Sequence, residues 1–105
     1  MDREQTRKLA AIMFTDIANF TQITSLDEEK AVELINLQKS LFYPIVKQFN
    51  GRWLKEMGDG LLLSFASSKN AIRCGIKLQS KSKNIDDLNI RIGIHQGDVI
   101  ISGDY

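Results

Sequence analysis

The sequence predicts an α+β fold in which helices cover one face of a mainly antiparallel sheet. Three observations support this class. After eight mostly polar residues, the chain has an apolar run that is too short for a typical helix, and a long helical pattern follows it. A turn that contains glycine separates two short strand-like runs. A second helical pattern then leads into a segment that alternates with period two, so the expected order is β-α-α-β-β-α-β-β.

The first strand is expected at residues 9–14, where Leu9-Ala10-Ala11-Ile12-Met13-Phe14 is continuously apolar. Such a run is typical of a strand that is buried on both faces. Asp16 lies at the exit of this strand. Residues 1–8 are mostly polar or charged, and we expect them to fray.

The long helix is expected to begin after Asp27, a suitable N-cap, and to end at Asn50-Gly51, where glycine suits the left-handed position past a helix. Pro44 falls inside the pattern and is expected to kink the helix or to split it around Tyr43. The apolar residues that recur with helical period are Ala31, Leu34, Ile35, Leu41, Phe42, Ile45, Val46 and Phe49.

The next two strands, at 52–56 and 61–65, flank Met57-Gly58-Asp59-Gly60, which predicts a hairpin with Asp59 at its tip. Ser67 or Ser68 is expected to cap the second long helix. Residues 88–95 then alternate cleanly between apolar and other side chains, and a turn at 96–98 is expected to lead into a last strand at 99–101. This layout resembles the ferredoxin-like arrangement, which places the end of the first strand beside the central hairpin.

Composition excludes several classes of function. The chain has 105 residues, 43% hydrophobic content and a formal net charge of +1, so no strong field favours a nucleic-acid polymer or an anionic membrane. One cysteine cannot form an internal disulfide, and no signal peptide is evident. No segment approaches the roughly 20 apolar residues of a membrane span. We therefore expect a cytoplasmic protein without membrane contact from this segment.

Asp16 and Asp59 are the candidate metal ligands. One lies at a strand end and the other in a tight glycine turn, and hard divalent cations need fixed carboxylates of this kind. The alternative is that Asp16 caps the following helix and that Asp59 only forms an Asp-Gly turn.

Four segments, taken together, resemble the class III nucleotidyl (adenylate/guanylate) cyclase catalytic domain. The segments are Leu9 to Ile17 with Phe20-Thr21, Asn50-Gly51 through Lys55, Gly58-Asp59-Gly60, and Arg91 to Val99. The resemblance spans nearly the whole chain, and it implies that residues 1–105 form a single partial cyclase domain that is truncated at its C-terminal end.

The resemblance also implies roles for individual residues. Asp16 and Asp59 correspond to the catalytic aspartates, and together with Ile17 they would bind two ions of Mg²⁺ or Mn²⁺. Lys55 corresponds to the lysine that recognises adenine, which indicates ATP. A lysine can donate to the acceptor ring nitrogen of adenine but has no acceptor for the amine of guanine. The remaining substrate-binding residues, which would hold the triphosphate, are Ile17, Asn19, Phe20 and Thr21.

The implied function is that of an adenylate cyclase, which converts ATP to cyclic AMP and pyrophosphate as a homodimer. Residues that stabilise the transition state in the family are not found in residues 1–105, so these residues alone are expected to have little activity. The alternative is a regulatory module that binds nucleotide and metal without turnover. A diguanylate cyclase is less well supported, because its glycine-rich acidic signature is missing from the hairpin.

Four other residues are weaker candidates. His95 has no partner histidine or cysteine nearby and is assigned no chemistry, and Cys74 fits a small core residue. Trp53 could stack on a base, but packing against the long helix is the favoured use. Asp98 occupies a position where some relatives carry a basic residue that contacts phosphate, a contact that an acidic residue cannot make.

Overall fold

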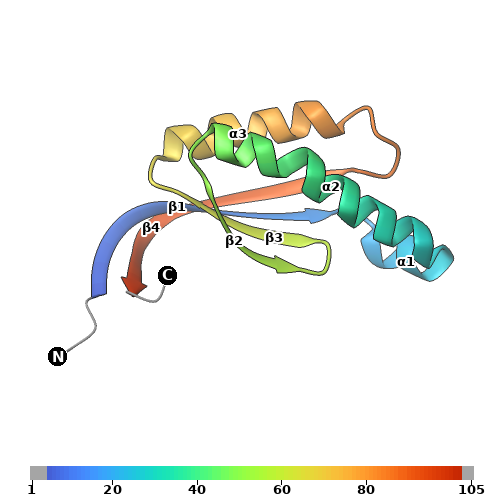
Figure 1. The fold of residues 1–105 in the computed structure, drawn as a ribbon, viewed down its shortest axis with the longest axis horizontal. Helices are drawn as coiled ribbons and strands as arrows, with labels where there is room; N and C mark the ends of the chain where they lie inside the picture. The colour runs from blue at the N-terminus through green and yellow to red at the C-terminus, as the bar shows by residue number, and fades with distance from the viewer. Residues whose placement is uncertain (1–4, 103–105) are drawn as a thin grey trace.

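The computed structural model describes residues 5–102, and it shows two long helices packed on one face of a four-stranded sheet, with a short third helix packed against one of them (Figure 1). The strand order is β2-β3-β1-β4, and all three neighbouring pairs are antiparallel. The predicted α+β class and its antiparallel layout are therefore confirmed. The elements are β1 (Gln5–Ile17), α1 (Phe20–Leu26), α2 (Glu28–Gln48), β2 (Arg52–Met57), β3 (Gly60–Phe65), α3 (Ser68–Ser82) and β4 (Ile90–Ser102).

The longest pairing joins β1 and β4, from Gln5 opposite Ser102 to Ile17 opposite Ile90. Strand β1 thus begins before Leu9. Residues 5–8, which were expected to fray, are extended and paired with β4, so that prediction is wrong for them. The prediction of a turn at 96–98 is also wrong, because β4 continues through these residues. Glycine and aspartate favour turns in a sequence, but here each residue has a partner on β1 that keeps the chain extended. The side chains of residues 99–101 lie outside the described ones.

Helix α2 is a single helix that contains Pro44, so of the two expected outcomes, a kink or a split around Tyr43, the split does not occur. Proline removes one backbone donor. The helix nevertheless continues because Phe42 and Val46, on either side of Pro44, are both fully buried against the core. At the other end, the Asp27 side chain accepts a hydrogen bond from the Lys30 amide at 3.1 Å, which confirms the predicted N-cap.

The end of α2 differs from the prediction in one detail. Asn50, and not Gly51, has the left-handed conformation, with φ of 60°. Gly51 is needed for space, because a Cβ atom there would lie 2.6 Å from the ring of Phe65 and 2.7 Å from a methyl carbon of Val46. Its amide donates to the Val46 carbonyl at 2.8 Å. The close contact holds the beginning of β2 against the core.

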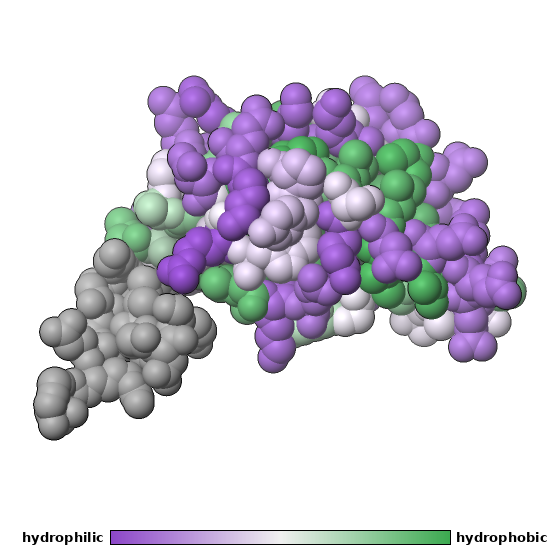
Figure 2. Space-filling model, in the orientation of Figure 1, coloured by the Kyte–Doolittle hydropathy of each residue, from purple (hydrophilic) through white to green (hydrophobic). Residues whose placement is uncertain are grey.

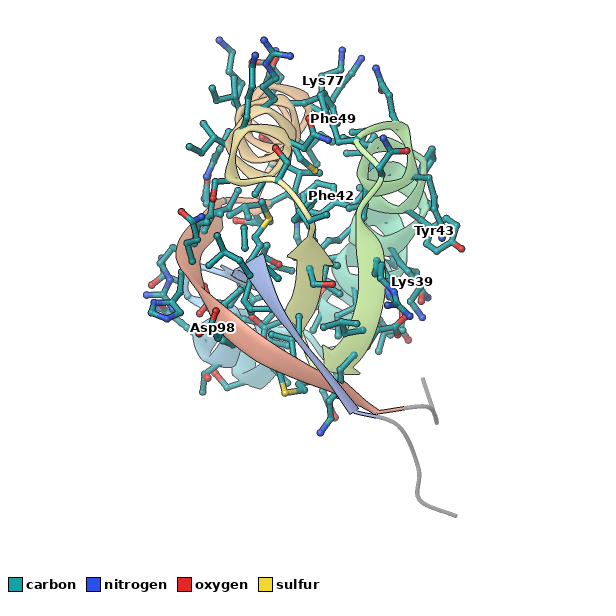
Figure 3. All side chains as sticks on the ribbon, turned by 90° about the vertical axis from the view of Figure 1, so that its left-hand side faces the viewer. Lys39, Phe42, Tyr43, Phe49, Lys77 and Asp98 are labelled. Atoms are coloured by element: carbon teal, nitrogen blue, oxygen red, sulfur yellow. The ribbon has the colours of Figure 1, made fainter. Side chains whose placement is uncertain are left out.

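The core lies between the helices and the sheet. Figure 3 shows Phe42 directed from α2 into this space, whereas Lys39 and Tyr43 point away from it. Polar side chains cover the upper edge of the molecule in Figure 2, where α3 lies in Figure 1. Among the described residues, no helix is both long enough and apolar enough to cross a bilayer. The buried apolar residues include Ala11, Met13, Ile17, Leu34, Phe42, Val46, Leu61, Leu63, Phe65, Cys74 and Leu78.

The other face of the sheet carries no helix, and we call it the open face (Figure 1). Side chains alternate between the two faces of a strand, so Thr15 and Ile17 face the helices while Phe14 and Asp16 face outward. Phe14 is 51% exposed although it lies on a central strand. The open face is therefore the side on which Asp16 is accessible.

Candidate active site

Asp59 lies in the two-residue turn of the β2-β3 hairpin, between the paired residues Met57 and Gly60. Gly58, the first turn residue, has φ of 60°, and a glycine with positive φ at this position is the arrangement of type II′ hairpins. The Asp59 carboxylate does not point away from the sheet. Its Oδ2 accepts a hydrogen bond from the amide of Ile17 at 2.8 Å. This bond joins the hairpin tip to the end of β1, an arrangement that the ribbon in Figure 1 also shows.

Asp16 immediately precedes Ile17, so the two predicted carboxylates lie at the same end of the sheet. Asp16 does not cap a helix: Asn19 precedes α1, and the carboxylate of Asp16 binds Arg91 instead. Arg91 Nε lies 2.7 Å from Asp16 Oδ1, and its Nη2 lies 3.0 Å from Oδ2. The alternative use of Asp16 as a helix cap is therefore excluded.

Arg91 is a site residue that the sequence reasoning did not single out. It lies directly opposite Asp16 in the β1-β4 register. Hydrogen bonding to Asp16, followed by the charges of Asp16 and Asp59, raises the pKa of the Arg91 guanidinium. The positive charge of Arg91 thus interacts favourably with both carboxylates. A signal existed in the sequence, because the period-two pattern of β4 places residue 91 on the face opposite to Ile90 and Ile92.

Asp98 lies elsewhere. It pairs with Leu9, near the beginning of β1, whereas Arg91 pairs with Asp16 near its end. In Figure 3, Asp98 is on the flank of the molecule opposite to Lys39 of α2. Position 98 is thus remote from the two aspartates, and the cation beside them comes from position 91.

The segment between β1 and α1 follows the two carboxylates. Ile17 is 1% exposed, and the next amide, that of Ala18, donates to the Asn89 carbonyl at 2.7 Å. Asn19 has a left-handed φ of 62°, which turns the chain into α1. Phe20 packs against the core, and Thr21 follows it in the first turn of α1. The predicted substrate residues 17, 19, 20 and 21 are therefore contiguous with the Asp16 end of β1.

Lys55 is on β2, an edge strand, and its side chain is exposed. It pairs with Leu62, which in turn pairs with Phe14. This row crosses the open face at Phe14, which is the neighbour of Asp16 on the same side of β1. Residues two apart on a regular strand face the same side. The register shift between Trp53 and Lys55 instead lets Trp53 face α2 while Lys55 faces the open side of the sheet. Among the described side chains, no ion pair includes Lys55.

Trp53 and Cys74 have structural roles. The Trp53 ring packs against Tyr43 of α2, with centroids 5.3 Å apart, and its Nε1 donates to Glu56 at 2.9 Å. The expected packing of Trp53 on the long helix is confirmed. Cys74 is fully buried, and burial raises the pKa of its thiol to about 11, which confirms it as a core residue.

Two buried polar side chains lie behind the carboxylates. Gln38 of α2 is 1% exposed, and its Nε2 donates to the backbone carbonyl of Asp59 at 3.2 Å. Thr15, the residue before Asp16, is 4% exposed, and its hydroxyl has no hydrogen-bond partner among the described residues. Sequence reasoning missed Gln38, although a polar residue between Leu34 and Phe42 in a helical apolar row is a visible anomaly.

The donor atoms suit a hard divalent cation. Asp16 and Asp59 offer carboxylate oxygens, which are the ligands that such cations prefer. Within residues 5–102, no group of three or more histidine, cysteine, aspartate or glutamate side chains could hold a metal ion, so Asp16 and Asp59 would be the side-chain ligands. The residues present therefore fit Mg²⁺ or Mn²⁺, whose remaining ligands are commonly water and substrate phosphate.

Comparison with known proteins gives a consistent result. The family model described as "Adenylate and Guanylate cyclase catalytic domain" matches residues 3–104. The serine/threonine-protein kinase pkn2 of Myxococcus xanthus is 32% identical over 101 residues, which cover 89% of this chain and 12% of the kinase. The "Putative adenylate cyclase 3" of Rhizobium meliloti (strain 1021) is 29% identical over 103 residues, 90% of this chain and 18% of that protein. The chain thus spans less than a fifth of either relative.

Solved structures share the fold. A bacterial light-regulated adenylyl cyclase aligns with a TM-score of 0.84 and 27% identity, over 94% of this chain and 33% of that one. The guanylyl cyclase Cya2 aligns with a TM-score of 0.81 and 23% identity, over 90% of this chain and 57% of that one. Adenylyl and guanylyl cyclases thus resemble this chain to a similar degree, so the likeness does not distinguish ATP from GTP as the substrate.

Proposed function

This chain belongs to the family of adenylate and guanylate cyclase catalytic domains, and from this membership we propose that residues 1–105 form part of the catalytic domain of an adenylate cyclase. The reaction is the conversion of ATP to 3′,5′-cyclic AMP and pyrophosphate. The observation that carries the proposal is the hydrogen bond between Asp59 Oδ2 and the Ile17 amide. This bond holds the Asp59 carboxylate beside the main chain that directly follows Asp16. Two fixed carboxylates at one strand end suit phosphoryl chemistry that depends on metal ions.

Asp16 and Asp59 would bind two ions of Mg²⁺ or Mn²⁺, with the main-chain carbonyl of Ile17 as a further ligand. When bound, such ions would activate the ribose 3′-hydroxyl and neutralise the charge of the leaving pyrophosphate. The hydrogen bond from Ile17 occupies one side of the Asp59 carboxylate and leaves lone pairs on both oxygens for the ions. Asp16 has to exchange its Arg91 partner for a cation.

Arg91 is well placed to bind the polyphosphate of ATP. A guanidinium group that gives up a carboxylate keeps its planar set of donors, and these match two phosphate oxygens at once. Arg91 extends from the strand beside Asp16 and is largely exposed, so it can turn toward a ligand on the open face. The adjacent segment, with Asn19, Phe20 and Thr21, would contribute main-chain amides at the start of α1.

Lys55 would select adenine. Its ammonium group can donate to the N1 acceptor of adenine, whereas guanine presents a donor at the corresponding ring position. Lys55 lies on the open face beside the apolar row of Leu62 and Phe14, which could receive the flat face of a base. We propose that the protein acts as a homodimer in which Lys55 of one subunit faces Asp16 and Asp59 of the other.

The test is cyclic nucleotide formation by the full-length protein that carries this chain. We expect Mn²⁺ and ATP to give cyclic AMP, with GTP a poor substrate. Asp16→Asn and Asp59→Asn should each abolish turnover, whereas Asp98→Asn, a matched change of an exposed carboxylate on the far part of β4, should not. Binding of ATP with Mn²⁺ but no turnover by the wild type would instead favour a nucleotide-binding regulatory module.

A further inference from the structure

Gln38 is the one glutamine with an almost fully buried side chain in the row by which α2 faces the sheet. Its neighbours in this row are apolar, and it is 1% exposed. Its Nε2 atom donates to the backbone carbonyl of Asp59, while its Oε1 atom is buried without a partner among the described residues. Half of this buried amide is therefore unsatisfied.

For the stability of the fold alone, an amide at this position is a poor choice, because only one end of it is hydrogen-bonded. A buried polar atom without a hydrogen bond costs free energy, whereas an apolar side chain of similar size adds to the core. The neighbouring residue of α2 shows the contrast. Lys39 reaches Glu56 of β2 at 3.0 Å through an exposed ion pair, a kind of contact that costs little and contributes little.

The hydrogen bond of Gln38 has a specific target. Asp59 is held at two points: the Ile17 amide of β1 binds its carboxylate, and the Gln38 amide of α2 binds its backbone carbonyl. Turn residues without such supports can rotate about their backbone angles. Two bonds from two different elements fix both the position of Asp59 and the direction of its carboxylate. Groups that orient a metal ligand from behind commonly change metal affinity when they are altered.

We propose that Gln38 is a positioning residue for Asp59 and sets the affinity of the site for divalent cations. This inference rests on the proposed function, in which Asp16 and Asp59 bind those cations. Gln38 touches neither substrate nor metal in this scheme. It acts through the backbone of Asp59, so its loss should change metal binding more than it changes the fold.

The test measures Mn²⁺ binding directly, by electron paramagnetic resonance of free Mn²⁺ with the full-length protein. Gln38→Leu should weaken binding by about tenfold, at the lower end of what such supporting residues usually contribute. The matched control is Gln79→Leu. Gln79 of α3 also donates its Nε2 to a strand carbonyl, that of Ile90, at 2.7 Å, but it does not bond to Asp59. This control should leave Mn²⁺ affinity unchanged.

Two further measurements separate positioning from folding. In Gln38→Leu and Gln38→Met, the Mn²⁺ concentration needed for half-maximal activity should rise, while kcat at saturating Mn²⁺ should approach that of the wild type. A purely structural role would instead lower the melting temperature and kcat with no change in Mn²⁺ affinity. In the wild type, the side-chain amide protons of Gln38 should exchange slowly and shift in NMR spectra when Mg²⁺ is added.

The outcomes distinguish the two proposals. If Asp59→Asn binds Mn²⁺ as tightly as the wild type does, the proposed metal site itself is wrong. If Asp59→Asn loses binding while Gln38→Leu and Gln38→Met keep the affinity of the wild type, the site stands and the role of Gln38 is refuted. Slow exchange with no response to Mg²⁺ would likewise refute it.

Discussion

Two substitutions of Asp59 separate its structural role from its chemical role. Asp59→Ala removes the acceptor of the Ile17 amide, and an unsatisfied buried donor costs about 1–3 kcal/mol. Asp59→Asn can keep a carbonyl oxygen in the place of Oδ2. Its cost is the difference between a charge-assisted and a neutral hydrogen bond, about 1 kcal/mol. The alanine variant should therefore be clearly less stable than the asparagine variant.

Thermal unfolding followed by circular dichroism measures this difference. In a domain of about 100 residues, 1 kcal/mol corresponds to about 4–8 °C in Tm. We expect Asp59→Ala to lower Tm by about 5–20 °C and Asp59→Asn to lower it by no more than about 8 °C. Ligands that bind only the folded state raise Tm, so Mn²⁺ should stabilise the wild type. Both Asp59 variants should lose that response, because neither keeps the carboxylate.

Asp98→Asn is the control, since Asp98 is exposed and pairs with Leu9, well away from Asp16 along β1. It should keep both the Tm and the Mn²⁺ response of the wild type. Equal Tm values for Asp59→Ala and Asp59→Asn would show that the bond to Ile17 does not contribute to stability. A full Mn²⁺ response in Asp59→Asn would refute the assignment of Asp59 as a metal ligand.

The remaining predictions concern specificity, phosphate binding and the core. Lys55→Glu should lower the ratio of kcat/KM for ATP over GTP by at least tenfold, because glutamate accepts from guanine and repels the adenine N1; an unchanged ratio would remove the support for ATP. Arg91→Gln should weaken ATP binding about tenfold in calorimetry. Its Tm should change by less than about 8 °C, because the ion pair with Asp16 is exposed. A large decrease in Tm with unchanged ATP binding would contradict this. Gly51→Ala should destabilise the fold by about 1–3 kcal/mol in urea unfolding, because its Cβ would lie 2.6 Å from the Phe65 ring; wild-type stability would show that the ring can move. Cys74 should react with a thiol reagent only after unfolding. Because the fold raises the pKa of its thiol from 9.0 to about 11, the contribution of Cys74 to stability should be complete below pH 9 and should be lost as the pH rises toward 11. A Cys74→Ala variant with the same alkaline pH dependence of stability would contradict this.

The sequence predicted the elements whose signals are local. The N-cap at Asp27, the hairpin around Asp59 and the capping serine at Ser67 depend on residues within a few positions of each other, and all three are present. The predictions that failed were also local readings. Pro44 and the 96–98 segment favour a break in isolation, but packing of α2 and pairing with β1 outweigh those preferences.

The sequence by itself determined the family, the order of the elements as far as the last strand, and Asp16 and Asp59 as candidates, because motifs and periodicity are properties of neighbouring residues. Only the tertiary structure showed what surrounds them. Arg91 is far from Asp16 in the chain and becomes its partner through the register of β4 on β1. Gln38 reaches Asp59 because α2 packs across the hairpin. A strand register and a helix packing position depend on the whole core, so no local pattern could have specified these two contacts.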